Sequence, residues 1–219
     1  MEHLKPVKVH SHPRSGTHLL AACLKLNFYP DVDLGRDVAG IGHWSQRVKV
    51  GGFAWIKLLG GHNFWNGQMR GVYVYRDGRD VAASLFRSKR FLNRKWAGMT
   101  FAEFLREPLD WRGSPAQRAE PGPTIAEHWR AHLESWLPRP GVVGVRYEDL
   151  CTLPNMTLEG VREALGLEHQ GKYTVPQELV GVLPNEGRIG AWRDYFDADD
   201  VAFFFERVPG NFWGLWDGG

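Results

Sequence analysis

The stretch VKVHSHPRSGTHLL, residues 7–20, decides the fold that this sequence predicts. Its alternating valines indicate a strand from Pro6 to His10, and HPRSGTH then forms a turn before an apolar helical face begins at Leu19. A turn of this kind exposes backbone N–H groups at the positive end of a helix, where they bind an anion, typically a phosphate. An ordinary strand-to-helix turn is the alternative interpretation.

The side chains of this turn favour anion binding. Arg14 brings a full positive charge, and the hydroxyls of Ser15 and Thr17 add hydrogen-bond donors. The corresponding loop of nucleotide triphosphatases has Gly-Lys followed by Ser or Thr, so that the lysine reaches the phosphates and the hydroxyl binds magnesium. Here Gly16 is followed by Thr17 and His18, which weakens the prediction of a kinase.

Strand and helix patterns alternate along the rest of the chain. Alternation of this kind predicts right-handed crossovers, and therefore a parallel sheet flanked by helices. We expect an α/β fold in a single domain over residues 1–219. Strands buried on both faces are predicted at 53–59, where Gly60-Gly61 ends the strand, at 72–75 and at 141–147. Helices are predicted from Asp80, from the capping box Thr124–Glu127 with an apolar face that reaches Trp136, and at 157–167. A surface loop is predicted at 106–123.

The composition excludes several classes of protein. The chain has 219 residues, of which 43% are hydrophobic and 24% charged, and a formal net charge of +2, too small for a dedicated nucleic-acid binder. Its two cysteines are too few for a disulfide framework or a zinc site. No stretch approaches the ~18 apolar residues of a membrane span, and the N-terminus lacks an apolar leader. We therefore expect a soluble, cytoplasmic protein.

A second strand–turn–helix pattern lies at residues 72–86, which read VYVYRDGRDVAASLF. Arg76 ends the predicted strand and Ser84 follows eight residues later in the next helix, so that both can converge on a second anionic group. Asp77 and Asp80 are expected to be turn and N-cap residues rather than catalysts.

These motifs resemble those of the sulfotransferase family that uses 3′-phosphoadenosine 5′-phosphosulfate (PAPS). HPRSGTH is similar to the family's 5′-phosphosulfate loop, and RDGRDVAAS to its 3′-phosphate motif. VRYEDL at 145–150 matches a family signature, and TIAEHWRAHLESW at 124–136 is similar to the helix that precedes its central strand. GRIGAWRDYF at 187–196, here called the late segment, resembles the part of the family that folds over the cofactor.

The resemblance implies a fold related to P-loop kinases and transfer of a sulfonyl group from PAPS to a hydroxyl or amine of a small-molecule acceptor. The product of the cofactor is then adenosine 3′,5′-bisphosphate (PAP), and no metal is required. By position, Arg14 takes a catalytic place at the bridging oxygen of the leaving phosphate. The residues expected to bind the cofactor are Arg14, Ser15, Gly16, Thr17 and His18 at the 5′ end, Arg76 and Ser84 at the 3′-phosphate, Tyr147 at the adenine, and Gly187 and Arg188 in the late segment.

The acceptor must lose a proton as it attacks, so a general base is needed. In small-molecule sulfotransferases the base is a histidine in a Lys-Thr-His motif at a strand end. Here Lys57 matches the lysine, whereas the histidine, His62, comes three positions late. Between Asp37 and Asp77 there is no carboxylate, and His43 is the only other histidine. We predict His62 as the base and Lys57 as a second catalytic residue; His43, or a merely hydrogen-bonded His62, is the alternative.

Two other functions stay open at this point. The late part of the chain reads Asn185-Glu186-Gly187 where the family has Arg-Lys-Gly, which leaves Arg188 as the candidate substitute at the 3′-phosphate. A sulfotransferase-like module that binds PAP without catalysis is one alternative, and a small-molecule kinase of the same architecture is the other. An aromatic, lipidic or sugar-ring acceptor is indicated by the aromatic residues in or beside the predicted acceptor walls at 30–52 and 106–123: Trp44, Trp55, Phe64, Trp65 and Trp111.

Overall fold

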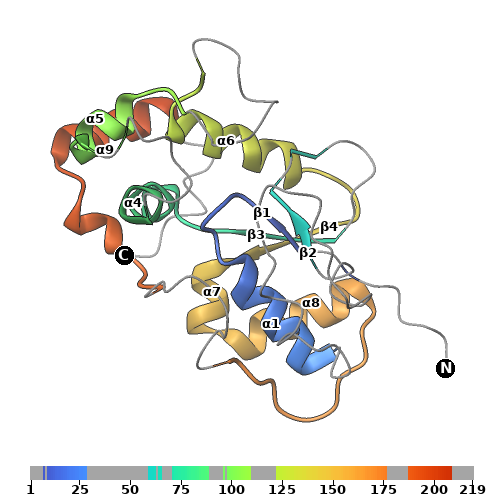
Figure 1. The fold of residues 1–219 in the computed structure, drawn as a ribbon. Coiled ribbons are helices and arrows are strands. Elements are labelled where there is room, and N and C mark those ends of the chain that lie inside the picture. The colour runs from blue at the N-terminus through green and yellow to red at the C-terminus, as the bar shows by residue number, and fades with distance from the viewer. Residues whose placement is uncertain are drawn as a thin grey trace, which may run out of the picture. The chain divides into compact units, whose positions relative to one another are not determined.

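The computed structural model describes residues 7, 9–28, 59–62, 64–65, 71–88, 96, 98–109, 122–176 and 187–208. Strands and helices alternate in these ranges, and every strand pair is parallel, which confirms the predicted α/β fold with a parallel sheet flanked by helices (Figure 1). The chain divides into two compact units, residues 1–76 with 135–187 and residues 77–134 with 188–219. The single domain over 1–219 stays a prediction.

The first unit is built on a four-stranded sheet with the strand order β2-β1-β3-β4. Val9 of β1 pairs with Val72 of β3, and both side chains are fully buried, because these two strands occupy the middle of the described sheet. The strands are β1 (Val9–Ser11), β2 (Leu59–Gly61), β3 (Gly71–Tyr75) and β4 (Val142–Arg146).

Two predicted strands differ from those observed. Gly60 and Gly61 were expected to end a strand but belong to β2, which pairs with β1 through the backbone and needs no side chains for that pairing. Residues 53–58 lie outside the described residues. The prediction that 141–147 is buried on both faces is wrong: Val145 alone is buried within β4, because β4 lies at the edge of the described sheet. Tyr147 begins the next helix.

Three helices cover one face of this sheet: α1 (Thr17–Phe28), α7 (Tyr147–Thr152) and α8 (Pro154–Leu165) (Figure 1). The helix predicted at 157–167 begins earlier because proline fits the first turn of a helix, where its missing N–H costs nothing. It ends at Leu165 and is capped by Gly166, whose φ of 63° is left-handed. Leu20, Leu24 and Val161 pack with the strand valines into one core.

The opposite face of the sheet carries an aromatic stack. Side chains alternate along a strand, so Tyr73 points away from Val72 and Val74. Its ring centroid lies 5.4 Å from that of Trp136, which also stacks on His10 at 4.3 Å. Trp136, predicted on the apolar face of its helix, is fully buried and covers this side of the sheet.

The second unit is helical. The predicted capping box is confirmed: the Glu127 carboxylate accepts the Thr124 N–H at 2.8 Å, and the Thr124 hydroxyl accepts the Glu127 N–H at 3.5 Å. The helix predicted from Asp80 begins at Gly78, where a Cβ atom would stand 2.7 Å from the ring of Phe204. The helices of this unit are α4 (Gly78–Ser88), α5 (Phe101–Arg106), α6 (Ile125–Trp136), η3 (Ala191–Asp194) and α9 (Ala198–Arg207). The last two residues of α6 belong to the first unit.

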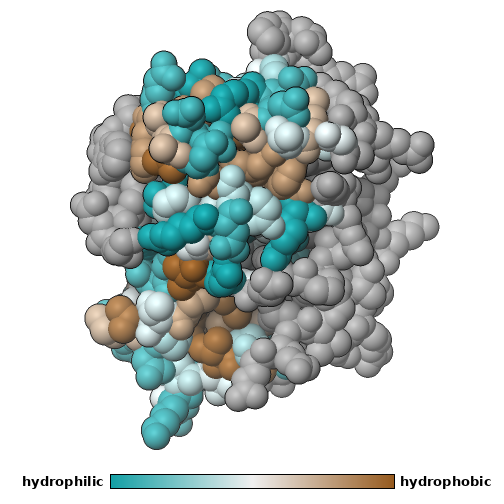
Figure 2. Space-filling model, turned by 90° about the vertical axis from the view of Figure 1, so that its left-hand side faces the viewer, coloured by the Kyte–Doolittle hydropathy of each residue, from teal (hydrophilic) through white to brown (hydrophobic). Residues whose placement is uncertain are grey.

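None of the helices in the described ranges combines the length and the hydropathy that crossing a membrane requires. On the face drawn in Figure 2, the hydrophobic residues among those described gather in small groups separated by hydrophilic ones.

We expect the protein to lose stability in mild acid because of His128 in α6. Its side chain is buried, and burial lowers its pKa from 6.5 to about 4. Between these values the unfolded chain binds a proton that the native protein does not bind, so the free energy of unfolding falls as the pH falls. From pH 7 to pH 4.5 this residue should cost about 2–3 kcal/mol. Denaturant titrations at pH 7 and pH 4.5 should show that His128→Leu loses less of its free energy of unfolding than the wild type does, by this amount. Equal losses in the two proteins would contradict the assignment to His128.

Candidate functional site

The turn between β1 and α1 has the backbone geometry of an anion-binding loop. Arg14 has a φ of 70° and Gly16 one of 98°, and the Ser15 N–H donates to the His12 carbonyl at 3.3 Å. A left-handed conformation is uncommon for a residue with a side chain and costs energy, and it concentrates at functional sites. Alternation of hand along such a turn points successive N–H groups into one concavity, where an anion binds.

The Ser15 hydroxyl indicates what this concavity is built to hold. The residue is fully buried, and its Oγ has no hydrogen-bond partner in the part of the chain that the structure describes. A buried polar group without a partner costs about 1–3 kcal/mol, and such a group needs an explanation. The loop therefore fits a bound phosphate group, whose oxygens would accept from Ser15 and from the neighbouring N–H groups.

Tyr147 joins three of the predicted cofactor residues within the first unit. Its ring lies so close to Gly16 that a Cβ atom there would stand 2.3 Å from the Tyr147 Cδ2 atom. The Cζ atom of Arg76, which is buried at the end of β3, lies 4.6 Å from the ring centroid. The hydroxyl donates to the Gly187 carbonyl at 2.8 Å, and burial raises the pKa of this phenol far above its usual value, so it stays a donor.

His62 lies at the end of β2 and contacts the same loop through Ser11. Its Nδ1–H donates to the Ser11 carbonyl at 2.8 Å and lies 3.1 Å from the Ser11 hydroxyl. That hydroxyl is in turn 2.5 Å from the Thr17 hydroxyl. All three side chains are buried. The structure thus connects the predicted base to the predicted 5′-phosphate loop.

The remaining predicted site residues are distributed as follows. His18 is half-buried in the first turn of α1. Ser84, in α4, and Arg188, which forms an exposed ion pair with Asp194, belong to the second unit. Among the predicted acceptor residues, Phe64 is 40% exposed and Trp65 lies under the guanidinium group of Arg139. The residues that fall outside the described ranges are Lys57, His43, Trp44, Trp55 and Trp111.

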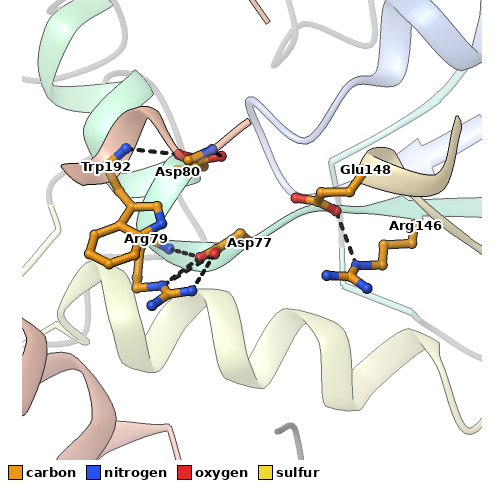
Figure 3. A network of polar contacts seen from close by, with 7 residues as sticks. Asp77, Arg79, Asp80, Arg146, Glu148 and Trp192 are labelled. Atoms are coloured by element: carbon orange, nitrogen blue, oxygen red, sulfur yellow. Dashed lines mark hydrogen bonds and ion pairs between the residues drawn. The ribbon is translucent and has the colours of Figure 1, made fainter. Parts of the chain in front are cut away.

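Two polar residues have roles that the sequence does not predict. Ser11 connects His62 to Thr17, and its only signal is that a small polar residue follows a buried strand. Asp80 was expected to be an N-cap, but Asp77 has that role, since its carboxylate accepts the Arg79 N–H at 2.8 Å. Asp80 is instead the third residue of α4 and binds the late segment (Figure 3).

The comparisons with known proteins agree with the sequence motifs. The chain matches the family model of the sulfotransferase domain over residues 57–180, which is more than half of its length. It therefore belongs to the sulfotransferase family. The search of the curated proteins found no match.

Solved structures show the same fold. Mouse sulfotransferase SULT7A1 complexed with PAP is 18% identical, with a TM-score of 0.58 over 93% of this chain and 82% of that one. Retinol dehydratase in a complex with retinol and PAP is 17% identical, with a TM-score of 0.57 over 95% of this chain and 82% of that one. A further structure of retinol dehydratase, with androsterone and PAP, has a TM-score of 0.51 at 16% identity over 95% of this chain and 81% of that one.

We expect Gly16→Ala to abolish measurable binding of PAP. The new methyl group would collide with the Tyr147 ring, and the φ of 98° disfavours any side chain, so the loop must deform. Calorimetric titration with PAP measures the loss. Gly160→Ala is the matched control, because a Cβ atom at Gly160 meets nothing within 4 Å and alanine favours the surrounding helix α8. Equal PAP affinity in both variants would show that the loop does not bind the nucleotide.

Proposed function

We propose that this protein transfers a sulfonyl group from PAPS to the hydroxyl or amine of a small acceptor. The observation that carries the proposal is the loop after β1, in which Arg14 and Gly16 are left-handed and the buried Ser15 hydroxyl has no partner among the described residues. Family membership supports the same reaction class. When bound, PAPS supplies the sulfonyl group and the phosphate that leaves.

Arg14 is the proposed catalytic residue of this loop. Negative charge grows on the oxygen that bridges phosphorus and sulfur as the S–O bond breaks, so a guanidinium group beside it acts more strongly in the transition state than in the ground state. The N–H groups of Gly16 and Thr17 bind the phosphate, and Ser15 contributes its hydroxyl, because its N–H donates to the His12 carbonyl. In-line transfer of a charged group needs positioning and charge stabilisation above all, as in phosphoryl transfer.

Arg76 binds the 3′-phosphate of the nucleotide. The side chain is 3% exposed and lies over the Tyr147 ring, a placement that restricts its rotamers before the ligand arrives. Tyr147 supports the nucleotide site with its ring and orients Gly187 with its hydroxyl. Ser84, His18 and Arg188 stay predicted cofactor residues on the strength of the resemblance.

His62 removes the proton from the acceptor. Because its Nδ1 donates to the Ser11 carbonyl, the neutral ring carries its lone pair on Nε2, the nitrogen that then accepts the proton. Lys57 is proposed to add positive charge beside the transferring group.

We propose an acceptor with an apolar body. Phe64 follows His62 by two residues, and its ring is 40% exposed, so an apolar ring or chain can pack on it. The similar structures that hold retinol and androsterone support a small apolar molecule of this kind. An acceptor screen with labelled PAPS identifies the compound.

The test of the proposed function has two stages. Calorimetry should detect binding of PAP without metal and no comparable binding of ATP with magnesium; the reverse result would favour a kinase. A transfer assay with labelled PAPS and a panel of hydroxyl and amine acceptors follows. Binding of PAP without transfer to any acceptor would leave a non-catalytic nucleotide-binding module.

A further inference from the structure

Asp80 is a buried carboxylate whose partners lie in the late segment. It is 1% exposed, in the first turn of α4. Its Oδ2 accepts the Gly190 N–H and its Oδ1 accepts the Trp192 N–H, each at 2.9 Å (Figure 3). A charged group taken out of water must regain hydrogen bonds. Asp80 regains two of them from backbone groups 110 and 112 residues further along the chain.

The same helical turn also fixes the side chain of Trp192. The Cζ atom of Arg79 lies 4.0 Å from the centre of the Trp192 ring. Arg79 is held in turn by Asp77, whose carboxylate accepts from the guanidinium group at 2.7 Å (Figure 3). The first turn of α4 therefore binds both the backbone and the ring of one residue of the late segment.

Residues 190–194 of the late segment have few means of holding this conformation by themselves, whereas Phe196, at the end of the segment, is buried, and its ring centroid lies 4.8 Å from that of Phe101. Gly190 is left-handed with a φ of 75°, and η3 is a single 3₁₀ turn of four residues, none of them buried. Short 3₁₀ helices have poor hydrogen-bond geometry, and a segment with little buried apolar surface opens easily. For residues 190–194, the hydrogen bonds to Asp80 add stabilisation that burial of their own side chains does not provide.

We infer that Asp80 is a positioning residue, which keeps the late segment in its cofactor-binding conformation through the N–H groups of Gly190 and Trp192. Ser84 follows Asp80 by four residues, hence on the same face of α4, so the carboxylate also fixes the late segment beside a predicted 3′-phosphate residue. This inference rests on the proposed function, because it concerns how strongly the nucleotide is bound. The role assigned to Asp80 is exerted through these two N–H groups.

The test compares Asp80→Asn with Asp200→Asn. Asp200 is the matched control: it is also a buried aspartate at the third position of a helix, α9, but it pairs with Arg106. Asparagine at position 80 must turn its NH₂ group toward one of the two N–H donors, so one hydrogen bond is lost and replaced by repulsion. We expect amide exchange at Gly190 and Trp192 to become faster, and the dissociation constant of PAP to rise about ten- to hundredfold.

A merely structural carboxylate would not change nucleotide selectivity. We expect Asp80→Asn to lose more affinity for PAP than for AMP, because Arg188 in the late segment and Ser84, four residues after Asp80, are the predicted 3′-phosphate residues. Asp200→Asn should leave the ratio of PAP affinity to AMP affinity unchanged. Faster exchange with an unaltered PAP affinity, or equal effects of the two variants, would overturn the inference.

Two further results separate this inference from the proposed function. A wild-type protein that does not bind PAP would reject the proposed function, and the inference with it. A wild type that binds PAP, with Asp80→Asn binding equally well, would reject the inference alone. If Asp80→Asn does not fold, Arg79→Ala replaces it: loss of the ring contact should raise the PAP dissociation constant several-fold, and an unchanged constant would overturn the inference.

Discussion

Replacement of His62 by asparagine should lower kcat by roughly 10²–10⁴, the usual contribution of a general base. The Asn Nδ2 group can still donate to the Ser11 carbonyl, which accepts from His62 Nδ1 at 2.8 Å, so the variant removes Nε2 while it keeps the contact with the loop. The affinity for PAP should therefore change little. Single-turnover transfer rates and calorimetry measure the two quantities separately.

Two further variants show whether the loss of rate comes from the removal of a general base at position 62. His62→Ala removes the contact with Ser11 as well, and it should add a loss of PAP affinity to the loss of rate. His43→Ala tests the other histidine of the same carboxylate-free segment and should keep the wild-type rate. Full activity in His62→Asn together with loss in His43→Ala would assign the base to His43, and full activity in both would exclude both residues as the base.

Replacement of Arg76 by alanine should cost about 2–4 kcal/mol of PAP binding, the range for removing one partner of a desolvated charge pair. The buried guanidinium group is the proposed counter-charge of the 3′-phosphate, so the variant should bind PAP and AMP with equal affinity. Arg76→Lys keeps the charge but not the planar fork, and an intermediate affinity is expected. Calorimetric titration with both nucleotides gives the ratio.

Arg146→Ala is the matched control for Arg76→Ala. Arg146 ends β4 and pairs with Tyr75, the residue before Arg76, but its side chain turns to Glu148 at 3.4 Å (Figure 3). Arg146→Ala should leave the ratio of PAP affinity to AMP affinity unchanged. A wild-type protein that binds AMP as tightly as PAP would show that the 3′-phosphate site has been assigned wrongly.

The elements that depend on residues close in sequence could be predicted well. The capping box of Thr124 and Glu127 and the strand–turn–helix units around Gly16 and Arg76 all follow from local patterns, and the structure contains each of them. The residues that form β2 and the burial of β4 could not be predicted in the same way. The pairing of Gly60-Gly61 and the exposure of β4 depend on which strands lie alongside them, which local composition does not state.

The polar connections of the site could not be predicted for the same reason. Ser11 and His62 are 51 residues apart, and Asp80 and Gly190 are 110 residues apart. In sequence, Asp80 comes five residues after a strand and looks like a helix cap, and only the folded chain shows that Asp77 already caps α4. The nucleotide residues could be named because the resemblance supplies them, and their roles stay predictions.

The position of Tyr147 has a consequence for how variants of this site combine. One phenol ring touches the loop at Gly16 and the side chain of Arg76, and its hydroxyl binds Gly187. Energetic effects of substitutions add when sites are independent and fail to add when the residues share a partner. Losses measured at these three positions will therefore not sum, and a double-mutant cycle through Tyr147 is the way to divide the nucleotide's binding energy between its two ends.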